Sequence, residues 1–197
     1  MTKEFWKKVW DAKGESASND LLYLDGYEHL NIDFNSDTIC DKIVATMNIS
    51  PGDRVLEVGC GAGFLARELQ VYDYVGVDYS RSLINKHAEL FENHTVMVAE
   101  GCSLPFDDGS FDKVFCFGVM QYFPSRDYAD KALDEMKRVA RSSIFLGDLK
   151  IAATRQEHFV YPQNDLEEQG YQFTECLYVP NDVERYNAFL ELENDLE

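Results

Sequence analysis

The sequence predicts an α/β protein with a doubly wound, mostly parallel seven-stranded sheet, an antiparallel C-terminal strand pair and an N-terminal helical lid. Five short runs rich in Val, Phe and Ile predict strands that are buried on both faces, as in a parallel sheet. They read RVLEVGC, YVGVD, TVMVAE, KVFCFGV and SSIFLGDL. Segments with helical spacing alternate with these runs, and this alternation is typical of right-handed β-α-β crossovers.

The first 36 residues are predicted to fold over the rest of the chain. Apolar residues recur at helical spacing in FWKKVW (residues 5–10), and Gly14 is a natural end for this helix. The stretch that follows is aromatic and poorly periodic, which favours a segment that covers a site over a framework element. Residues 1–36 are therefore expected to form a lid, and residues 37–197 the doubly wound α/β domain.

The remaining elements follow from similar patterns. An apolar stripe predicts a helix from Asp37 to Met47, and SPGD at residues 50–53 ends it. Further helices are expected near residues 63–70, 81–92 and 127–141. Beyond residue 150, LEEQGYQFTECLYV and ERYNAFLEL predict one helix and two strands that form an antiparallel edge pair.

The composition indicates a packed globular protein that avoids polyanions. Hydrophobic residues make up 45% of the chain, and 18 basic residues face 36 acidic ones, for a net charge of −18. Such a field repels phosphate backbones and anionic bilayers, so nucleic acid and membranes are not expected partners. The five cysteines form no CxxC pair, and the N-terminus does not resemble a leader peptide, so a cytoplasmic protein without a metal site is expected.

The stretch EVGCGAG, residues 57–63, predicts a ligand-binding turn after the first strand. Glycines let a ligand approach main-chain N–H groups at the carboxyl end of a parallel strand. A tight turn without a ligand is the alternative. However, Asp78 ends the second strand, where a carboxylate can accept hydrogen bonds from both hydroxyls of a ribose. A nucleoside ligand is therefore favoured.

The spacing of the glycines and acids discriminates between nucleoside ligands. Dinucleotide sites require G-x-G-x-x-G, whereas Phe64 occupies the position of the third glycine here. Glu57 would repel a pyrophosphate but would attract the ammonium group of an amino acid. The ligand is therefore predicted to have a positively charged end, and a nicotinamide-dependent oxidoreductase is disfavoured.

Three segments resemble, in order, the motifs of class I, Rossmann-like S-adenosylmethionine-dependent methyltransferases of the small-molecule type. They are VLEVGCGAGFLARELQ, VGVDYS and LPFDDGSFDKVFCFGVMQYF, within residues 37–149. The resemblance implies that S-adenosylmethionine is the methyl donor and S-adenosylhomocysteine the product, without a metal. Two features depart from the family pattern: Glu100 stands where Asp is more frequent, and no PGG turn precedes the fifth strand.

The resemblance also implies roles for individual residues. Glu57 is expected to meet the amino group of the methionine moiety, Asp78 the ribose hydroxyls, and Tyr79 one face of the adenine. The other residues expected around the cofactor are Gly59, Cys60, Gly61, Glu100, Gly101, Cys102 and Phe117.

The methyl acceptor is expected to be a small molecule, sugar-linked metabolites included, methylated on O or N. The region FGVMQYFPS lacks the [DNS]PP[YFW] tetrad of many enzymes that methylate amide or nucleobase nitrogens. Transfer requires an acceptor about 3 to 3.5 Å from the methyl group and a base that removes its proton. His29 in the lid is the first candidate base, with Asp148 and His158 as alternatives. Gln121 and Tyr122 are expected to face the acceptor, and Tyr122 is counted among the catalytic candidates.

Two other functions stay open at the level of sequence. A protein methyltransferase would present an open acidic groove to a basic peptide. A regulatory protein could keep the residues that bind S-adenosylmethionine without any turnover.

Overall fold

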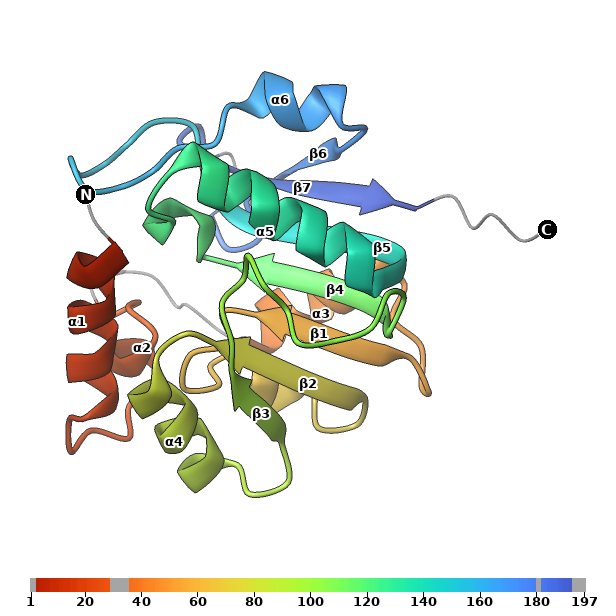
Figure 1. The fold of residues 1–197 in the computed structure, drawn as a ribbon. Helices are drawn as coiled ribbons and strands as arrows, with labels where there is room; N and C mark the ends of the chain where they lie inside the picture. Colours follow the sequence, from red (N-terminus) through yellow and green to blue (C-terminus); the bar gives the residue numbers. More distant parts are fainter. Residues whose placement is uncertain (1–2, 29–35, 180–181, 193–197) are drawn as a thin grey trace.

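The computed structural model describes residues 3–28, 36–179 and 182–192. Within them, seven strands form one sheet in the order β3-β2-β1-β4-β5-β7-β6 (Figure 1). The strands are β1 (Arg54–Val58), β2 (Asp73–Asp78), β3 (Thr95–Val98), β4 (Phe111–Phe117), β5 (Ala140–Lys150), β6 (Gln172–Glu175) and β7 (Arg185–Glu191). Strand β7 is antiparallel to β5 and β6, and the other neighbouring pairs are parallel. The predicted fold class is confirmed, including its antiparallel C-terminal pair.

Helices α3 and α5 cover opposite faces of the sheet (Figure 1). Alternate residues of β4 therefore enter two separate cores. Val114 and Cys116 pack in the core that contains α5, whereas Phe115 and Phe117 pack in the core that contains α3. Side chains of a strand point alternately to its two faces, so a strand between two helical layers must be apolar throughout. The described α-helices are α1 (Lys3–Gly14), α2 (Leu21–Leu24), α3 (Ser36–Met47), α4 (Arg81–Leu90), α5 (Arg126–Val139) and α6 (Gln163–Glu168).

Helix α1 packs against α4 and α2 packs against α1, beside the carboxyl ends of the strands (Figure 1). Trp6, Trp10 and Leu24 form a buried cluster with Leu83 of α4. The contact is close, because a Cβ added at Gly14 would lie 2.5 Å from the backbone nitrogen of Leu83. This packing places α1 and α2 next to the loops that follow β1 and β2.

One predicted helix is wrong. Residues 63–70 contain only the 3-10 turn Ala66–Glu68, although the helices expected near residues 81–92 and 127–141 are confirmed as α4 and α5. Gly63 has a φ of +102°, so no right-handed helix can begin before residue 64. The chain then turns again at Leu69, whose carbonyl accepts a hydrogen bond from Tyr72. Too few residues remain between these turns for a regular helix.

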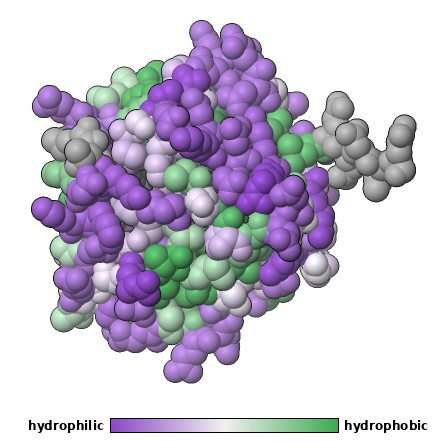
Figure 2. Space-filling model, in the orientation of Figure 1, coloured by the Kyte–Doolittle hydropathy of each residue, from purple (hydrophilic) through white to green (hydrophobic). Residues whose placement is uncertain are grey.

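The surface agrees with the excess of acidic residues. Hydrophilic residues cover most of the face in Figure 2, with apolar residues in smaller areas between them. No helix in the described ranges has both the length and the apolar character needed to cross a membrane. All five cysteines are free thiols; Cys102 is half-buried and the others are buried.

Candidate active site

The loop after β1 is held by bonds to β2 and by the N-terminal segment. The N–H of Gly59 donates to the carbonyl of Val77 at 2.7 Å, and the N–H of Gly61 donates to the Asp78 carboxylate at 3.2 Å. Gly61 has a φ of +51°, and a Cβ at this position would lie 2.1 Å from Oδ1 of Asp25. Only glycine fits there, because both the backbone angle and the space exclude a side chain.

Asp25 is a site residue that the sequence analysis missed. It follows α2, and its two carboxylate oxygens accept hydrogen bonds from the N–H groups of Ala62 at 2.7 Å and Phe64 at 2.9 Å. The N-terminal segment thus binds the glycine loop directly. The signal in the sequence is weak: a single acidic residue before Gly26, in a stretch without periodicity.

Three carboxylates surround this loop: those of Glu57 and Asp78 are buried, and that of Asp25 is half-buried. Burial is the main cause that raises the pKa of Asp25 to about 7, of Glu57 to about 8 and of Asp78 to about 6, and repulsion by nearby carboxylates adds to it. Glu57 accepts a hydrogen bond from the Tyr74 hydroxyl at 2.7 Å. None of the three forms an ion pair with a basic residue of the described chain. This cluster favours a ligand with a cationic end.

The carboxylates line a cavity that is partly open to solvent. The predicted cofactor residues on its wall are Glu57, Gly59, Cys60, Gly61, Asp78, Tyr79, Gly101 and Phe117. The N-terminal segment completes the wall with Lys3, Trp10, Asp25 and Tyr27. The structure therefore brings most of the predicted cofactor residues together around one space, and it adds four that belong to the expected lid.

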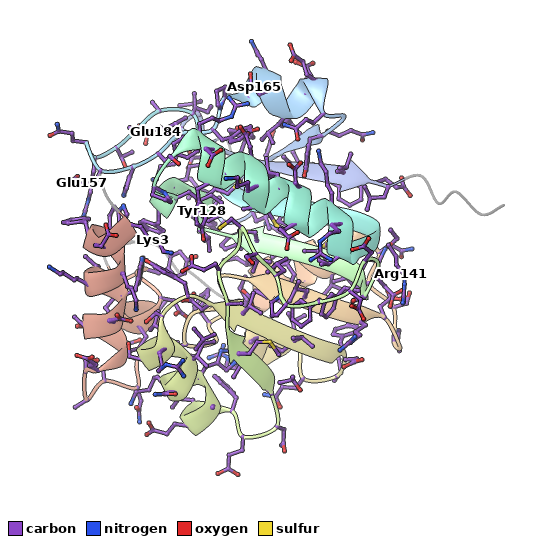
Figure 3. The ribbon with its side chains drawn as sticks, in the orientation of Figure 1. Lys3, Tyr128, Arg141, Glu157, Asp165 and Glu184 are labelled. Carbon is purple, nitrogen blue, oxygen red and sulfur yellow. The ribbon has the colours of Figure 1, made fainter. Side chains whose placement is uncertain are left out.

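Glu100 and Cys102 lie beside this cavity and not on its wall. The Glu100 carboxylate pairs with Lys3 at 2.5 Å and accepts a hydrogen bond from the Tyr128 hydroxyl at 2.9 Å. Figure 3 labels these two partners, Lys3 on α1 and Tyr128 on α5. Glu100 thus joins α1 to α5 in this structure, and the contact with adenine that was expected of it stays a prediction.

The side chain of His87, on α4, forms a hydrogen bond with the glycine loop. The ring is fully buried; Nδ1 lies 3.2 Å from the carbonyl oxygen of Gly61, and Nε2 lies 3.0 Å from Nδ1 of His94. Burial lowers the pKa of His87 to about 4, so the ring is neutral near pH 7. The neutral ring donates through Nδ1 to Gly61 and accepts through Nε2 from His94. His87 is therefore a positioning residue that the helical pattern alone did not reveal.

A second cavity, also partly open to solvent, adjoins the first. The side chains of Trp10, Tyr27 and Tyr122 line both cavities. Gln121 and Asp148, which were predicted to take part in acceptor binding or catalysis, line the second. Two adjoining spaces that share aromatic walls can hold two reactants next to each other.

The candidate bases differ in their surroundings. Asp148 is buried at a residue with a φ of +58°, and its carboxylate pairs with Arg185 at 2.6 Å. Burial raises the pKa of Asp148, while the Arg185 guanidinium opposes that rise. Burial also raises the pKa of Tyr122 to about 12, so this phenol is neutral near pH 7. His29 lies outside the described residues.

His158 lines the second cavity with its ring stacked on Trp6, the ring centroids 5.6 Å apart. Burial lowers the pKa of His158 to about 4, and the nearby cations Lys150, Arg155 and Arg185 lower it further. The imidazole is therefore neutral near pH 7 and a weak base. No cluster of three or more His, Cys, Asp or Glu side chains among the described residues has a geometry that could hold a metal ion.

The fold and the first cavity define a Rossmann-like domain for a nucleoside with a positively charged end. S-adenosylmethionine fits this description, since it combines a ribose diol for Asp78 with an ammonium and a sulfonium for the carboxylate cluster. Glu57 has no basic partner among the described residues, which agrees with such a ligand.

Comparisons with known proteins point to the same class. The family described as "Methyltransferase domain" matches residues 56–145. "Probable tRNA methyltransferase 9B" of Mus musculus is 36% identical over 92 residues, which are 45% of this chain and 20% of that protein. The chain thus spans only a fifth of the length of this curated relative.

Two solved structures share the fold. Phosphoethanolamine N-methyltransferase 1 of Haemonchus contortus superposes with a TM-score of 0.70 at 17% identity, covering 96% of this chain and 48% of that one. Magnesium protoporphyrin IX methyltransferase of Synechocystis PCC 6803, with bound S-adenosylmethionine, gives a TM-score of 0.67 at 15% identity and covers 97% of both chains. These two structures show that the chain shares the Rossmann-like fold of these methyltransferases, and the family match over residues 56–145 agrees with it.

Proposed function

We propose that this protein transfers the methyl group of S-adenosylmethionine to an O or N atom of a small-molecule acceptor and releases S-adenosylhomocysteine. The observation that carries the proposal is the pair of adjoining cavities with Trp10, Tyr27 and Tyr122 between them. The first contains the acids that fit a cationic nucleoside. The second has room for an acceptor on the other side of the aromatic wall.

The residues of the first cavity are proposed to bind and orient the donor. Asp78 would accept hydrogen bonds from the ribose, and Glu57 would hold the ammonium group. Bound S-adenosylmethionine supplies an activated methyl group on a sulfonium. Trp10 and Tyr27 exclude water from the region between the cavities, which strengthens the electrostatic interactions there. We propose that residues 1–36 act as the lid of this site.

Asp148 is proposed as the proton acceptor. The acceptor's lone pair forms the bond to the methyl carbon, and the sulfur–methyl bond breaks with its electron pair left on sulfur. The acceptor's proton passes to the Asp148 carboxylate, which lines the second cavity and whose pKa burial raises. A higher pKa makes this carboxylate a better base than an exposed one. Tyr122, a neutral phenol shared by both cavities, is proposed to position the acceptor.

A nucleic-acid acceptor has one observation in its favour, the likeness to a probable tRNA methyltransferase. That likeness covers 45% of this chain. The net charge of −18 would repel a phosphate backbone over most of the surface. The small-molecule acceptor is therefore the proposed one, and tRNA is included in the test as a competing substrate.

The first test measures thermal stability with S-adenosylmethionine, S-adenosylhomocysteine and NAD. A ligand at about 100 times its dissociation constant stabilises by about 2.7 kcal/mol, which for a chain of this size raises Tm by roughly 5 to 10 °C. We expect this shift with the first two ligands and none with NAD. Release of S-adenosylhomocysteine with small-molecule and tRNA panels then tests turnover. No shift with either methionine derivative would contradict the proposal, and turnover with tRNA alone would replace its acceptor.

A further inference from the structure

The second cavity is basic in a protein that is strongly acidic. Its lining includes four cations, Lys13, Lys150, Arg155 and Arg185, against two carboxylates, Glu28 and Asp148. The chain as a whole has twice as many acidic as basic residues. A local reversal of charge inside a cavity raises the concentration of oppositely charged ligands there.

Two of the four cations are already neutralised within the protein. Lys13 pairs with Glu28 at 2.8 Å, and Arg185 pairs with Asp148 at 2.6 Å. These pairs account for both carboxylates of the cavity. They leave Lys150 and Arg155 without a carboxylate of their own on its wall.

Lys150 and Arg155 form no ion pair and no side-chain hydrogen bond within the described ranges. Lys150 is only 7% exposed, and burial, followed by repulsion from Arg185, lowers its pKa. The Nζ of Lys150 is not sealed from solvent, so the ammonium faces the space of the cavity, where an anion can pair with it. Arg155, at the exposed rim, offers a planar fork of donors that suits a phosphate or carboxylate.

The cationic side chains converge on one place. Lys150, Arg155 and Arg185 come from β5, the loop after it and β7, yet all three lower the pKa of His158, which lines the same cavity. Residues from three segments can act together on one imidazole only if they lie around the same space. The imidazole itself is neutral near pH 7 and can donate or accept a hydrogen bond.

A polar group near the cofactor side of this cavity has no partner. Gln121 is 8% exposed, and its Nε2 donates to the carbonyl of Gly118 at 3.1 Å. Its Oε1 is buried and has no hydrogen bond with any described residue. A hydroxyl or amine of a ligand is the kind of group that would satisfy it. Its neighbour Tyr122 borders the cofactor cavity.

We propose that the methyl acceptor carries an anionic group, a phosphate or a carboxylate, which Lys150 and Arg155 bind while the accepting hydroxyl or amine faces Gln121 and Tyr122. The cavity is thus polarised along its length, with a cationic end at β5 and the following loop and a neutral end at the cofactor. This inference rests on the proposed methyl transfer for the identity of the ligand. The anion site itself does not depend on it.

The test measures binding of inorganic phosphate and of acetate by calorimetry at low ionic strength, with and without S-adenosylhomocysteine. The variants are Lys150→Gln and Arg155→Gln, with Lys150→Arg as the charge-conserving variant and Lys8→Gln, on the exposed face of α1, as the control. We expect each neutralisation to weaken anion binding about tenfold or more. Lys150→Arg should restore most of the binding, and Lys8→Gln should behave as wild type.

Two further readouts keep the outcomes distinct. Without ligand, Lys150→Gln should melt at the same temperature as wild type or higher, because it removes a cation that forms no ion pair within the described ranges and that Arg185 repels; a large loss of stability would assign Lys150 a structural role instead. Binding of phosphate but not acetate, or the reverse, identifies the anionic group. If neither anion binds, or if Lys150→Gln and Arg155→Gln bind both as wild type does, the inference is wrong.

The same variants separate this inference from the proposed function. Suppose that S-adenosylhomocysteine stabilises every variant and that the Lys150 and Arg155 variants bind anions as tightly as wild type. The proposed methyl transfer is then supported, and the anion site is contradicted. If the substitutions at these two residues weaken anion binding but neither methionine derivative stabilises the protein, the anion site is supported and the proposed function is contradicted.

Discussion

Single side chains determine the electrostatic character of the two cavities. Asp25, Glu57 and Asp78 make the first cavity acidic, and none of them has a basic partner on the described chain. Asp78 also accepts hydrogen bonds from the N–H groups of Gly61 at 3.2 Å and Ser80 at 2.8 Å. One carboxylate thus fixes the glycine loop and faces the cavity in which a ribose is proposed to bind.

The Asp78→Asn variant should bind S-adenosylhomocysteine about 10- to 100-fold more weakly, since each hydrogen bond to a charged group contributes roughly 1.5 to 3 kcal/mol. The fold should persist with a modest loss of Tm, because asparagine keeps one of the two acceptor oxygens that bind the N–H groups of Gly61 and Ser80 and replaces the other with a donor. Calorimetry measures the affinity, and circular dichroism checks the fold. Asp73→Asn, at the exposed start of the same strand, is the control. Equal affinity in both variants would refute the ribose assignment.

The buried imidazole of His87 leads to a separate prediction about how the stability of the folded protein depends on pH. Its pKa is about 4 in the folded protein, below the ordinary value of 6.5. A depressed pKa gives stability that is present above pH 6.5 and is lost as pH falls toward 4, by up to about 3 kcal/mol. The His87→Gln variant should be less stable than wild type at pH 7.5, and the gap should narrow below pH 6.5. Parallel melting curves across this range would show that His87 is not the group that titrates.

At the scale of elements, the contact between α1 and α4 connects the N-terminal segment to the glycine loop. Trp6 and Trp10 of α1 pack with Leu83 of α4. The same α4 carries His87, which bonds to the carbonyl of Gly61. Displacement of α1 should therefore affect both cavities, because Trp10 lines each of them.

The Gly14→Ala variant tests this contact. The added Cβ would lie 2.5 Å from backbone atoms of Ser82 and Leu83, which cannot move away as a side chain can. Overpacking of this kind costs about 1 to 3 kcal/mol. We expect a lower Tm and weaker binding of S-adenosylhomocysteine, measured by thermal shift and calorimetry. Lys8→Ala, on the exposed face of the same helix, should change neither. A Gly14→Ala protein with wild-type affinity would show that α1 does not support the cofactor cavity.

At the scale of the whole molecule, two cavities of opposite charge adjoin under one acidic surface. The first attracts a cation through three carboxylates, and the second offers Lys150 and Arg155 to an anion. An acceptor with an anionic end would be oriented by this difference, since its charged group is repelled from the first cavity and attracted to the far end of the second.

The carboxylate cluster predicts that binding of S-adenosylmethionine strengthens with pH. The folded-state pKa values of Asp25, Glu57 and Asp78 lie near 7, 8 and 6, above the ordinary values. For the ligand-free protein, these groups give stability that is lost as pH rises through 6 to 8. A cationic ligand is attracted by the ionised carboxylates and so offsets this loss. The affinity of the protein for S-adenosylmethionine should therefore rise about tenfold between pH 6 and 8. Calorimetry at each pH measures it, and Glu57→Gln should flatten the profile. A flat wild-type profile would exclude titration of the cluster.

Much of the fold was predictable because the signals are local. An apolar run such as that of β4 can be read from consecutive residues, and alternation with helices then determines a doubly wound sheet. The helix predicted over residues 63–70 is wrong, which shows the limit of local patterns. The apolar spacing is present there, but the positive φ of Gly63 and the turn at Leu69 leave too few residues for a helix.

The sequence by itself determined the strands, the glycine loop and the two acids that end β1 and β2, since each lies within a short motif whose geometry the backbone dictates. Only the tertiary structure brought Asp25 to the glycine loop, and only it gathered Lys150, Arg155 and Arg185 around one cavity. These residues have no shared spacing along the chain. They meet because the end of α2, the end of β5, the loop after β5 and the start of β7 all reach the site, through contacts that no periodic pattern encodes.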